Sequence, residues 1–360
     1  MSAHWQFQSN PGTPVSSSGS TSSTPPRSSL SEIKSVPPVL ILDPFAASME
    51  SKNRIRGKTG FVFDEKMTEH FNPWDSEHIE CPERILRAKE RCDELDLTKK
   101  CQMIDTRKAK KDEMLLCHSE EYLDQIKKMA DMEPDQRKEE CLTKFGSIYM
   151  NEKSYECAEI AAGSAIELTR AILDGEIQNG LALLRPPGHH ALNSAGNGFC
   201  LLNNVAIAAK YAKKEGKAQK ILIVDLDVHH GQSTQYNFYD DPNVLYFSIH
   251  RYEHGLFWPH LRESNFDYIG GSEDQPSCGK NFNIPLNKFG LGDEDYLSIF
   301  HQILMPVTHE FRPDLILVSA GYDSAIGKKN IYKKIEMFGM KNIFQKSRKN
   351  KNYLEFRKHL

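Results

Sequence analysis

The 360-residue chain contains no run of about 18 or more consecutive apolar residues, and its first residues show no basic segment followed by an apolar one. We therefore expect neither a membrane span nor a secretory signal. The eight cysteines are scattered and none of them forms a Cys-x-x-Cys pair, so we expect reduced thiols rather than a disulfide framework. These absences predict a protein of the cytoplasm, with the nucleus as a further compartment.

Charge is unevenly distributed along the chain, although the net charge is only −3. Residues 328–360 hold eleven Lys and Arg against two Asp and Glu, a net charge of +9, which leaves 35 basic and 47 acidic residues, a net charge of −12, in the rest. An acidic body repels nucleic-acid phosphates, so we expect no direct nucleic-acid partner. The basic end resembles a solvated appendage.

Composition divides the chain into three segments. The first forty residues contain twelve Ser and six Pro, and such a segment buries too little apolar surface to offset its ordering entropy. We therefore predict a disordered leader over 1–55, a folded domain over 56–327 and a basic tail over 328–360.

The folded segment alternates between helical and strand patterns. Apolar periodicity after Pro82, Ser154 and Asn203 predicts helices over 82–95, 154–173 and 203–215. Short apolar runs predict buried strands over 181–184, 220–224, 244–249 and 315–318. This alternation predicts an α/β fold with a central, mainly parallel sheet and helices on both faces, and ligands bind at the carboxyl ends of the strands in such sheets.

Histidines and carboxylates gather where these predicted strands end. Seven of the fourteen histidines lie between residues 189 and 260. The sequences Arg-Pro-Pro-Gly-His189-His190, Asp225-Leu-Asp227-Val-His229-His230 and Ala-Gly-Tyr-Asp323 each follow a predicted strand. Because parallel strands end at the same edge of a sheet, we expect these side chains to share one rim.

Three of these residues form a plausible metal-binding set. Asp227 and His229 are two residues apart on an extended segment, so both side chains point the same way. With Asp323 they give three ligands and one open position, which is the arrangement of a catalytic zinc. Asp225 can hold a histidine by its ring N–H, and the His189-His190 pair can transfer protons.

Other interpretations of the same residues remain open. A His-His pair in a loop is often solvated, and an Asp-x-Asp after a strand is often a turn, but four ionisable residues ending one apolar strand favour coordination. A two-metal ureohydrolase of the arginase type would use a similar sheet. It needs a second set of carboxylates, and Gln232 argues against that.

Four motifs together resemble the zinc-dependent histone deacetylase family, class II. They are Arg185-Pro-Pro-Gly-His-His-Ala191, Gly198-Phe-Cys-Leu-Leu-Asn-Asn204, Asp225-Leu-Asp-Val-His-His-Gly-Gln232 and Phe247-Ser-Ile-His-Arg-Tyr-Glu-His-Gly255. Trp258, where most members carry Phe, is most similar to the first catalytic domain of the tandem-domain tubulin deacetylases. The resemblance runs from about residue 58 to 327. It implies a three-layer arginase/deacetylase-like fold and hydrolysis of ε-N-acetyl-lysine in histones, tubulin or other acetylated proteins.

The resemblance also implies a role for individual residues. Asp227, His229 and Asp323 match the zinc ligands; His189 and His190 match the proton-transfer pair; Asp225 and Gln232 match the side chains behind them; Gly198, Phe199 and Trp258 match the acetyl-lysine tunnel; Ser147 matches a contact to the substrate backbone; and Asp225, Asp227, His229 and Ser248 match a structural potassium (K+) site. For the two aromatic residues, ordinary core packing is the alternative.

The end of the chain departs from the family. The family's domain continues with further sheet and helix and a Gly-rich loop whose tyrosine stabilises the oxyanion, whereas residues 328–360 contain no Gly-Gly-Tyr. Tyr322 matches a different position and does not replace that tyrosine. Losing one oxyanion donor costs about 10²–10³ in turnover. The sequence therefore predicts a C-terminally incomplete domain, either an enzyme of reduced activity or a form that only binds acetylated partners or competes for them.

Overall fold

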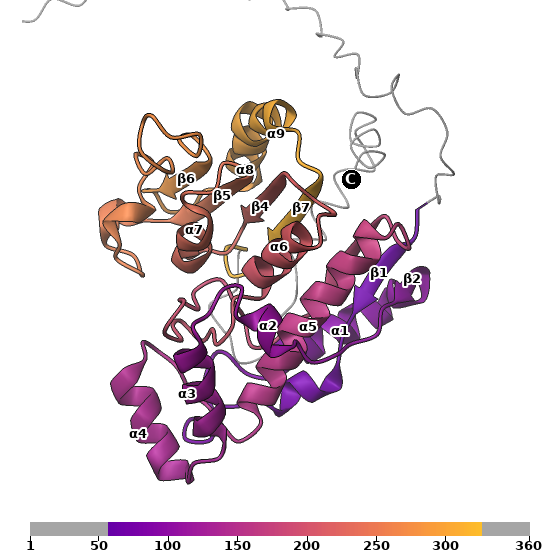
Figure 1. Cartoon of the computed structure of the whole chain (residues 1–360), viewed down its shortest axis with the longest axis vertical. Coiled ribbons are helices and arrows are strands. Elements are labelled where there is room, and N and C mark those ends of the chain that lie inside the picture. Colours follow the sequence, from indigo (N-terminus) through magenta and orange to yellow (C-terminus); the bar gives the residue numbers. More distant parts are fainter. Residues whose placement is uncertain (1–56, 326–360) are drawn as a thin grey trace, which may run out of the picture. The chain divides into compact units, whose positions relative to one another are not determined.

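The structure is a computed structural model and describes residues 57–325 (Figure 1). The helices are α1 (Glu83–Glu94), α2 (Lys111–Met114), α3 (Glu120–Ala130), α4 (Pro134–Lys144), α5 (Ser154–Leu173), α6 (Asn204–Lys214), α7 (Gln232–Phe238), α8 (Asp293–Ile299) and α9 (Met305–Phe311). The strands are β1 (Thr59–Val62), β2 (Cys101–Met103), β3 (Asn179–Ala182), β4 (Ile221–Asp225), β5 (Val244–Arg251), β6 (Asn281–Leu286) and β7 (Leu315–Ser319). The predicted leader and basic tail lie outside the described residues, so both stay predictions.

All strands in the described part of the chain pair in parallel, which confirms the predicted α/β fold. They form two sheets, one with the order β2-β1-β3 and one with the order β6-β5-β4-β7. Within residues 57–325 the two sheets are separate, since no described strand pairs with both β3 and β7. In the four-stranded sheet, Asp225 at the end of β4 pairs with Ser248 on β5 and Ser319 on β7. The carboxyl ends of these strands thus lie at one edge.

Helices cover both faces of the four-stranded sheet. Alternate residues of a strand point to opposite faces, so a strand that is buried throughout needs a core on each side. Ile221 and Ile223 of β4 belong to the main core, which includes α5 and α6. Leu222 and Val224 belong to a second core, in which Leu304 and Phe311 pack against the opposite face. None of the helices within 57–325 is long and apolar enough to cross a membrane.

Two predicted helix starts have different outcomes. Asn203 caps α6 as predicted, since its side chain accepts a hydrogen bond from the amide of Ala206 at 3.0 Å. Ser154 does not cap α5: it is the first helical residue, and its hydroxyl accepts from the amide of Asn151 at 2.8 Å. The helix ranges themselves agree with the sequence to within one or two residues.

Candidate metal and catalytic site

Two carboxylates and one imidazole converge beyond the ends of β4 and β7. The Nδ1 atom of His229 lies 3.0 Å from Oδ1 of Asp227 and 3.3 Å from Oδ2 of Asp323. One possible ligand atom from each of the three lies within 4.8 Å of the others. The structure thus brings together the three residues that the sequence predicts as ligands.

Backbone contacts hold the two carboxylates in place. The amide of Val228 donates to Oδ1 of Asp323 at 2.9 Å, and the amide of His229 donates to Oδ1 of Asp227 at 2.8 Å. Gly321 passes so close that a Cβ atom there would lie 2.1 Å from Oδ2 of Asp227. Gly321 is a site residue not predicted from the sequence, although its place after a strand and two residues before Asp323 could have indicated it.

His189 rests on a buried carboxylate. Its Nδ1 lies 2.9 Å from Oδ2 of Asp225, which also accepts a hydrogen bond from the hydroxyl of Tyr246 at 3.1 Å. Burial disfavours a charged His189, but the carboxylates of Asp225 and Asp227 outweigh it and raise its pKa to about 9. The carboxylates therefore favour the protonated, cationic form of this imidazole.

His190 rests on an amide instead. Its Nδ1 lies 2.7 Å from Oε1 of Gln232, and both side chains are buried. Burial and the neighbouring His189 hold the pKa of His190 well below its ordinary value of 6.5. With the two ring centroids only 3.8 Å apart, a neutral imidazole lies beside a charged one. This is a pattern typical of acid–base pairs.

The predicted substrate-contacting residues flank this pair. Trp258 presents an edge-to-face contact to His190 at 4.5 Å and to His229 at 5.5 Å between centroids. Phe199 is only partly buried, as is Trp258, so neither is an ordinary core residue.

Gly198 separates these groups, since a Cβ atom there would lie 2.6 Å from both His190 and Trp258, and its φ is +51°. The adjacent backbone is tied to Ser147, which is exposed and whose carbonyl accepts from the amide of Phe199 at 3.0 Å.

Two of the predicted potassium ligands have side chains that are already hydrogen-bonded. Ser248 is fully buried, and its hydroxyl is hydrogen-bonded to Nδ1 of His250 at 2.8 Å. One carboxylate oxygen of Asp225 is already shared by His189 and Tyr246. The family resemblance implies that a potassium ion would bind mainly to backbone carbonyls of the predicted residues, and this site stays a prediction.

The three-residue set itself fits zinc. It offers two carboxylates and one imidazole, which are ligand types that zinc binds, and three protein ligands leave the fourth position of a catalytic zinc site to water or substrate. The side chains of Asp227, His229 and Asp323 remain 16%, 31% and 33% exposed, so solvent and substrate can reach them.

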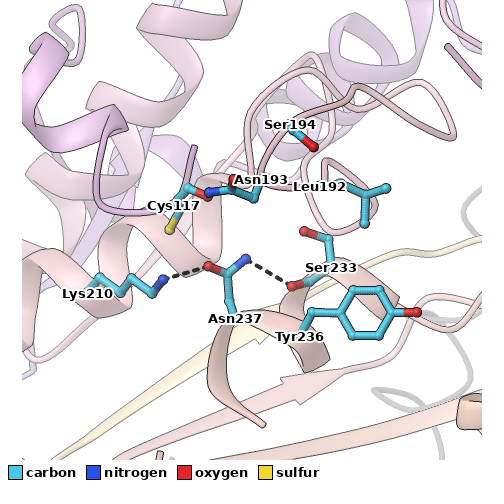
Figure 2. Close-up of a pocket in the computed structure, with 8 residues that line it drawn as sticks. All are labelled: Cys117, Leu192, Asn193, Ser194, Lys210, Ser233, Tyr236 and Asn237. Carbon is cyan, nitrogen blue, oxygen red and sulfur yellow. Dashed lines mark hydrogen bonds between the residues drawn. The ribbon is translucent and has the colours of Figure 1, made fainter. Parts of the chain in front are cut away.

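A separate cavity has a volume of about 410 Å³. Figure 2 shows Cys117, Lys210, Tyr236 and Asn237 among its lining residues, with Lys210 donating to Asn237 and Asn237 to the carbonyl of Ser233. None of the predicted site residues lines it. We therefore do not assign the catalytic chemistry to this cavity.

Comparisons with known proteins agree with the motifs. Residues 78–357 match the family model described as Histone deacetylase domain. Polyamine deacetylase HDAC10 of Danio rerio is 46% identical over 274 residues, which cover 75% of this chain and 40% of that protein. Histone deacetylase 6 of Caenorhabditis elegans is 42% identical over 281 residues, covering 77% of this chain and 28% of that protein. The chain thus spans less than half the length of these relatives.

A solved structure of a family member has a similar fold. The crystal structure of the HDA15 HD domain is 36% identical in sequence and superposes with a TM-score of 0.69, covering 76% of this chain and 75% of that one. The family match extends to residue 357 and so includes most of 328–360. The prediction that this segment lies outside the family is not decided by that range and stays a prediction.

Proposed function

The chain belongs to the histone deacetylase family, and from this premise we propose that it is a zinc-dependent protein lysine deacetylase, hydrolysing ε-N-acetyl-lysine. The observation that carries the proposal is the convergence of Asp227, His229 and Asp323 beside the His189–His190 pair. A two-metal ureohydrolase is disfavoured, because Gln232 stands behind His190 where a second ion would need a carboxylate.

In this proposal Asp227, His229 and Asp323 hold the zinc ion, which when bound polarises the acetyl carbonyl and lowers the pKa of water. His190 accepts the proton of the attacking water at Nε2, because its Nδ1 is engaged by Gln232. It then returns that proton to the leaving amine. His189, kept charged by Asp225, supplies positive charge where negative charge develops.

The substrate class has two candidates. Acetyl-lysine in proteins is favoured by the motifs shared with the tandem-domain tubulin deacetylases and by the relative named Histone deacetylase 6. Acetylated polyamines are the second candidate, since relatives at 45–47% identity are named Polyamine deacetylase HDAC10. The ratio of kcat/KM for an acetyl-lysine peptide and for an N-acetylated polyamine decides between them. A ratio in favour of the polyamine would overturn our choice of substrate and leave the zinc assignment intact. We propose the cytoplasm, with access to the nucleus, as the place of action.

Metal analysis tests the site. Purified protein should carry about one zinc per chain, and Asp227→Asn should lose that zinc together with turnover of a fluorogenic acetyl-lysine peptide. Asp274→Asn is the matched control, since this aspartate is exposed and belongs to neither candidate metal group. Unchanged zinc content in Asp227→Asn would overturn the assignment.

The same experiment separates the active and the binding-only forms of the proposal. An impaired form that binds acetylated partners retains zinc and shows negligible turnover. We propose measurable but reduced activity, and turnover equal to that of a complete domain from the same family would contradict the reduction.

A further inference from the structure

A series of four stacked side chains connects the surface to the candidate metal ligand His229. The ring of His229 lies nearly parallel to that of Phe257, with 5.2 Å between centroids and 14° between planes. The guanidinium of Arg251 lies 4.2 Å from the centroid of Phe257 and 4.7 Å from that of Phe289, which is 73% exposed. We call these four residues the Arg251 stack.

Arg251 is anchored to the segment that carries His229. It is the last residue of β5, and its amide donates to the carbonyl of Val228 at 2.8 Å. Its backbone therefore fixes the residue before the metal ligand, while its side chain contacts the ring that stacks on that ligand. Arg251 thus contacts both the backbone next to His229 and the Phe257 ring that stacks on His229.

The turn after β5 presents Phe257 to His229 in an unusual backbone conformation. Glu253 and His254 have φ values of +51° and +56°, a left-handed conformation that non-glycine residues adopt only rarely. Arg251 forms an ion pair with Glu253, and the amide of His254 donates to Oδ1 of Asn287 at 2.7 Å. The amide of Phe257 donates back to the carbonyl of Tyr252 at 3.1 Å. These contacts hold the turn in the conformation that the stack requires.

His229 needs such support because its polar contacts lie on one side. Within residues 57–325 the ring is hydrogen-bonded only at Nδ1, toward Asp227 and Asp323. Metal-bound histidines are normally oriented by a hydrogen bond to their second ring nitrogen, which no described residue supplies here. Rotation of an imidazole about χ2 is broad and weakly restrained by itself. A parallel aromatic ring restricts it.

We infer that Phe257 and Arg251 are positioning residues that hold the His229 imidazole in its metal-binding orientation. The inference rests on the proposed function, because it takes His229 as a metal ligand. Phe257 restricts the rotation of the ring, and Arg251 fixes Phe257 together with the turn that carries it. Neither residue touches the reacting atoms.

The test measures how fast the full chain, loaded with zinc, loses the ion to a chromogenic chelator. Phe257→Leu removes the ring but keeps apolar volume, Phe257→Tyr keeps the ring, and Arg251→Gln removes the planar charge. Arg262→Lys is the control, since its guanidinium lies over Tyr268 at 5.2 Å on the surface. We expect zinc loss about 10- to 100-fold faster in Phe257→Leu and Arg251→Gln, and unchanged loss in Phe257→Tyr and Arg262→Lys. We also expect kcat to fall more than KM rises in the two faster variants.

Different results separate this inference from the proposed function. If the unmodified chain binds no stoichiometric zinc, the proposed function fails first. If it binds zinc and Phe257→Leu releases it at the unmodified rate, the stack has no positioning role. Should Phe257→Leu not fold, Arg251→Gln and Phe257→Tyr still decide, because equal zinc loss in these two variants would overturn the inference.

Discussion

The Nδ1 atom of His190 lies 2.7 Å from Oε1 of Gln232, so this imidazole rests on a neutral amide. The adjacent His189 rests on the carboxylate of Asp225 at 2.9 Å. An amide oxygen stabilises an Nδ1–H group without adding negative charge, whereas a carboxylate also stabilises the imidazolium. Carboxylates therefore raise the pKa of His189, whereas burial and the neighbouring His189 lower the pKa of His190, because Gln232 brings no charge to offset them. The histidine on the amide is suited to accept a proton, and the histidine on the carboxylate is suited to supply charge.

Replacing the amide by a carboxylate changes this division. In Gln232→Glu the new charge lies against Nδ1 of His190 and raises the pKa of that imidazole. A base must be unprotonated to accept a proton, so the acidic limb of the pH profile of kcat/KM moves to higher pH. Profiles between pH 5 and 9 measure the shift. Gln219→Glu, on the exposed surface, is the control, and an acidic limb at the same pH in both variants would contradict the assignment of His190 as base.

Gly321 offers a test of the close approach to Asp227. In Gly321→Ala the added methyl group meets Oδ2 of Asp227 at 2.1 Å, so either the carboxylate or the loop after β7 must shift. A displacement of about 1 Å costs roughly 10²-fold in turnover, and we expect that loss together with weaker zinc binding. Gly292→Ala is the control, because a Cβ atom there meets only Oε2 of Glu294 at 3.6 Å. Full activity in Gly321→Ala would show that the site is less rigid than its geometry indicates.

The site could be predicted from sequence because one strand ends so abruptly. The apolar run Ile221–Val224 changes directly into Asp225-Leu-Asp227-Val-His229, and the two-residue spacing gives Asp227 and His229 the same direction. Sequence spacing does not reveal the stack on His229. Phe257 reaches that ring only because the turn after Arg251 takes up positive φ values, and no apolar or charge pattern specifies those.

The fold was predictable where burial produces a pattern. All five residues of β4 are buried, and the first four form one apolar run. Strand β6 does not, because Asn281 and Asn283 occupy its buried positions and both donate to Oε1 of Gln235. Its register depends on a polar network that only the tertiary structure assembles. The division into two sheets likewise depends on which strands meet, which local sequence does not encode.

The buried ion pair between Arg185 and Glu80 allows a prediction about stability. Arg185 is 1% exposed and binds Glu80 through Nε at 2.8 Å and Nη2 at 2.9 Å, while Nη2 also donates to the hydroxyl of Tyr149 at 3.0 Å. Glu80→Gln leaves the guanidinium charge uncompensated. We expect the free energy of unfolding to fall by about 3–5 kcal/mol in urea titrations.

The control for this change is an exposed pair. Glu94→Gln breaks the contact between Glu94 and Arg91, whose side chains are 63% and 38% exposed, respectively. Exposed pairs of this kind contribute at most about 1 kcal/mol to the free energy of unfolding. Similar losses in Glu80→Gln and Glu94→Gln would mean that Arg185 finds solvent or another partner when Glu80 is neutral.

The buried side chain of His118 makes the stability of the fold depend on pH. It is 1% exposed, its Nδ1–H donates to the carbonyl of Leu192 at 2.9 Å, and its Nε2 accepts from the amide of Asn203 at 3.0 Å. Burial is the main cause that lowers its pKa from 6.5 to about 4, and a proton on Nε2 would face the Asn203 N–H directly.

As the pH falls below 6.5, His118 becomes protonated in the unfolded chain, whereas in the folded chain it stays neutral until about pH 4. The free energy of unfolding is therefore at its full value above pH 6.5 and falls as the pH decreases from 6.5 to 4, by about 3 kcal/mol for this group. His250, also buried with a pKa lowered to about 4, adds a loss of the same sign. Urea titrations at pH 7.5 and 4.5 measure the total loss. It should be smaller in His118→Gln, which cannot titrate, and unchanged in the control His309→Gln, on the exposed surface. An equal loss in His118→Gln and the unmodified chain would show that His118 does not contribute to acid destabilisation.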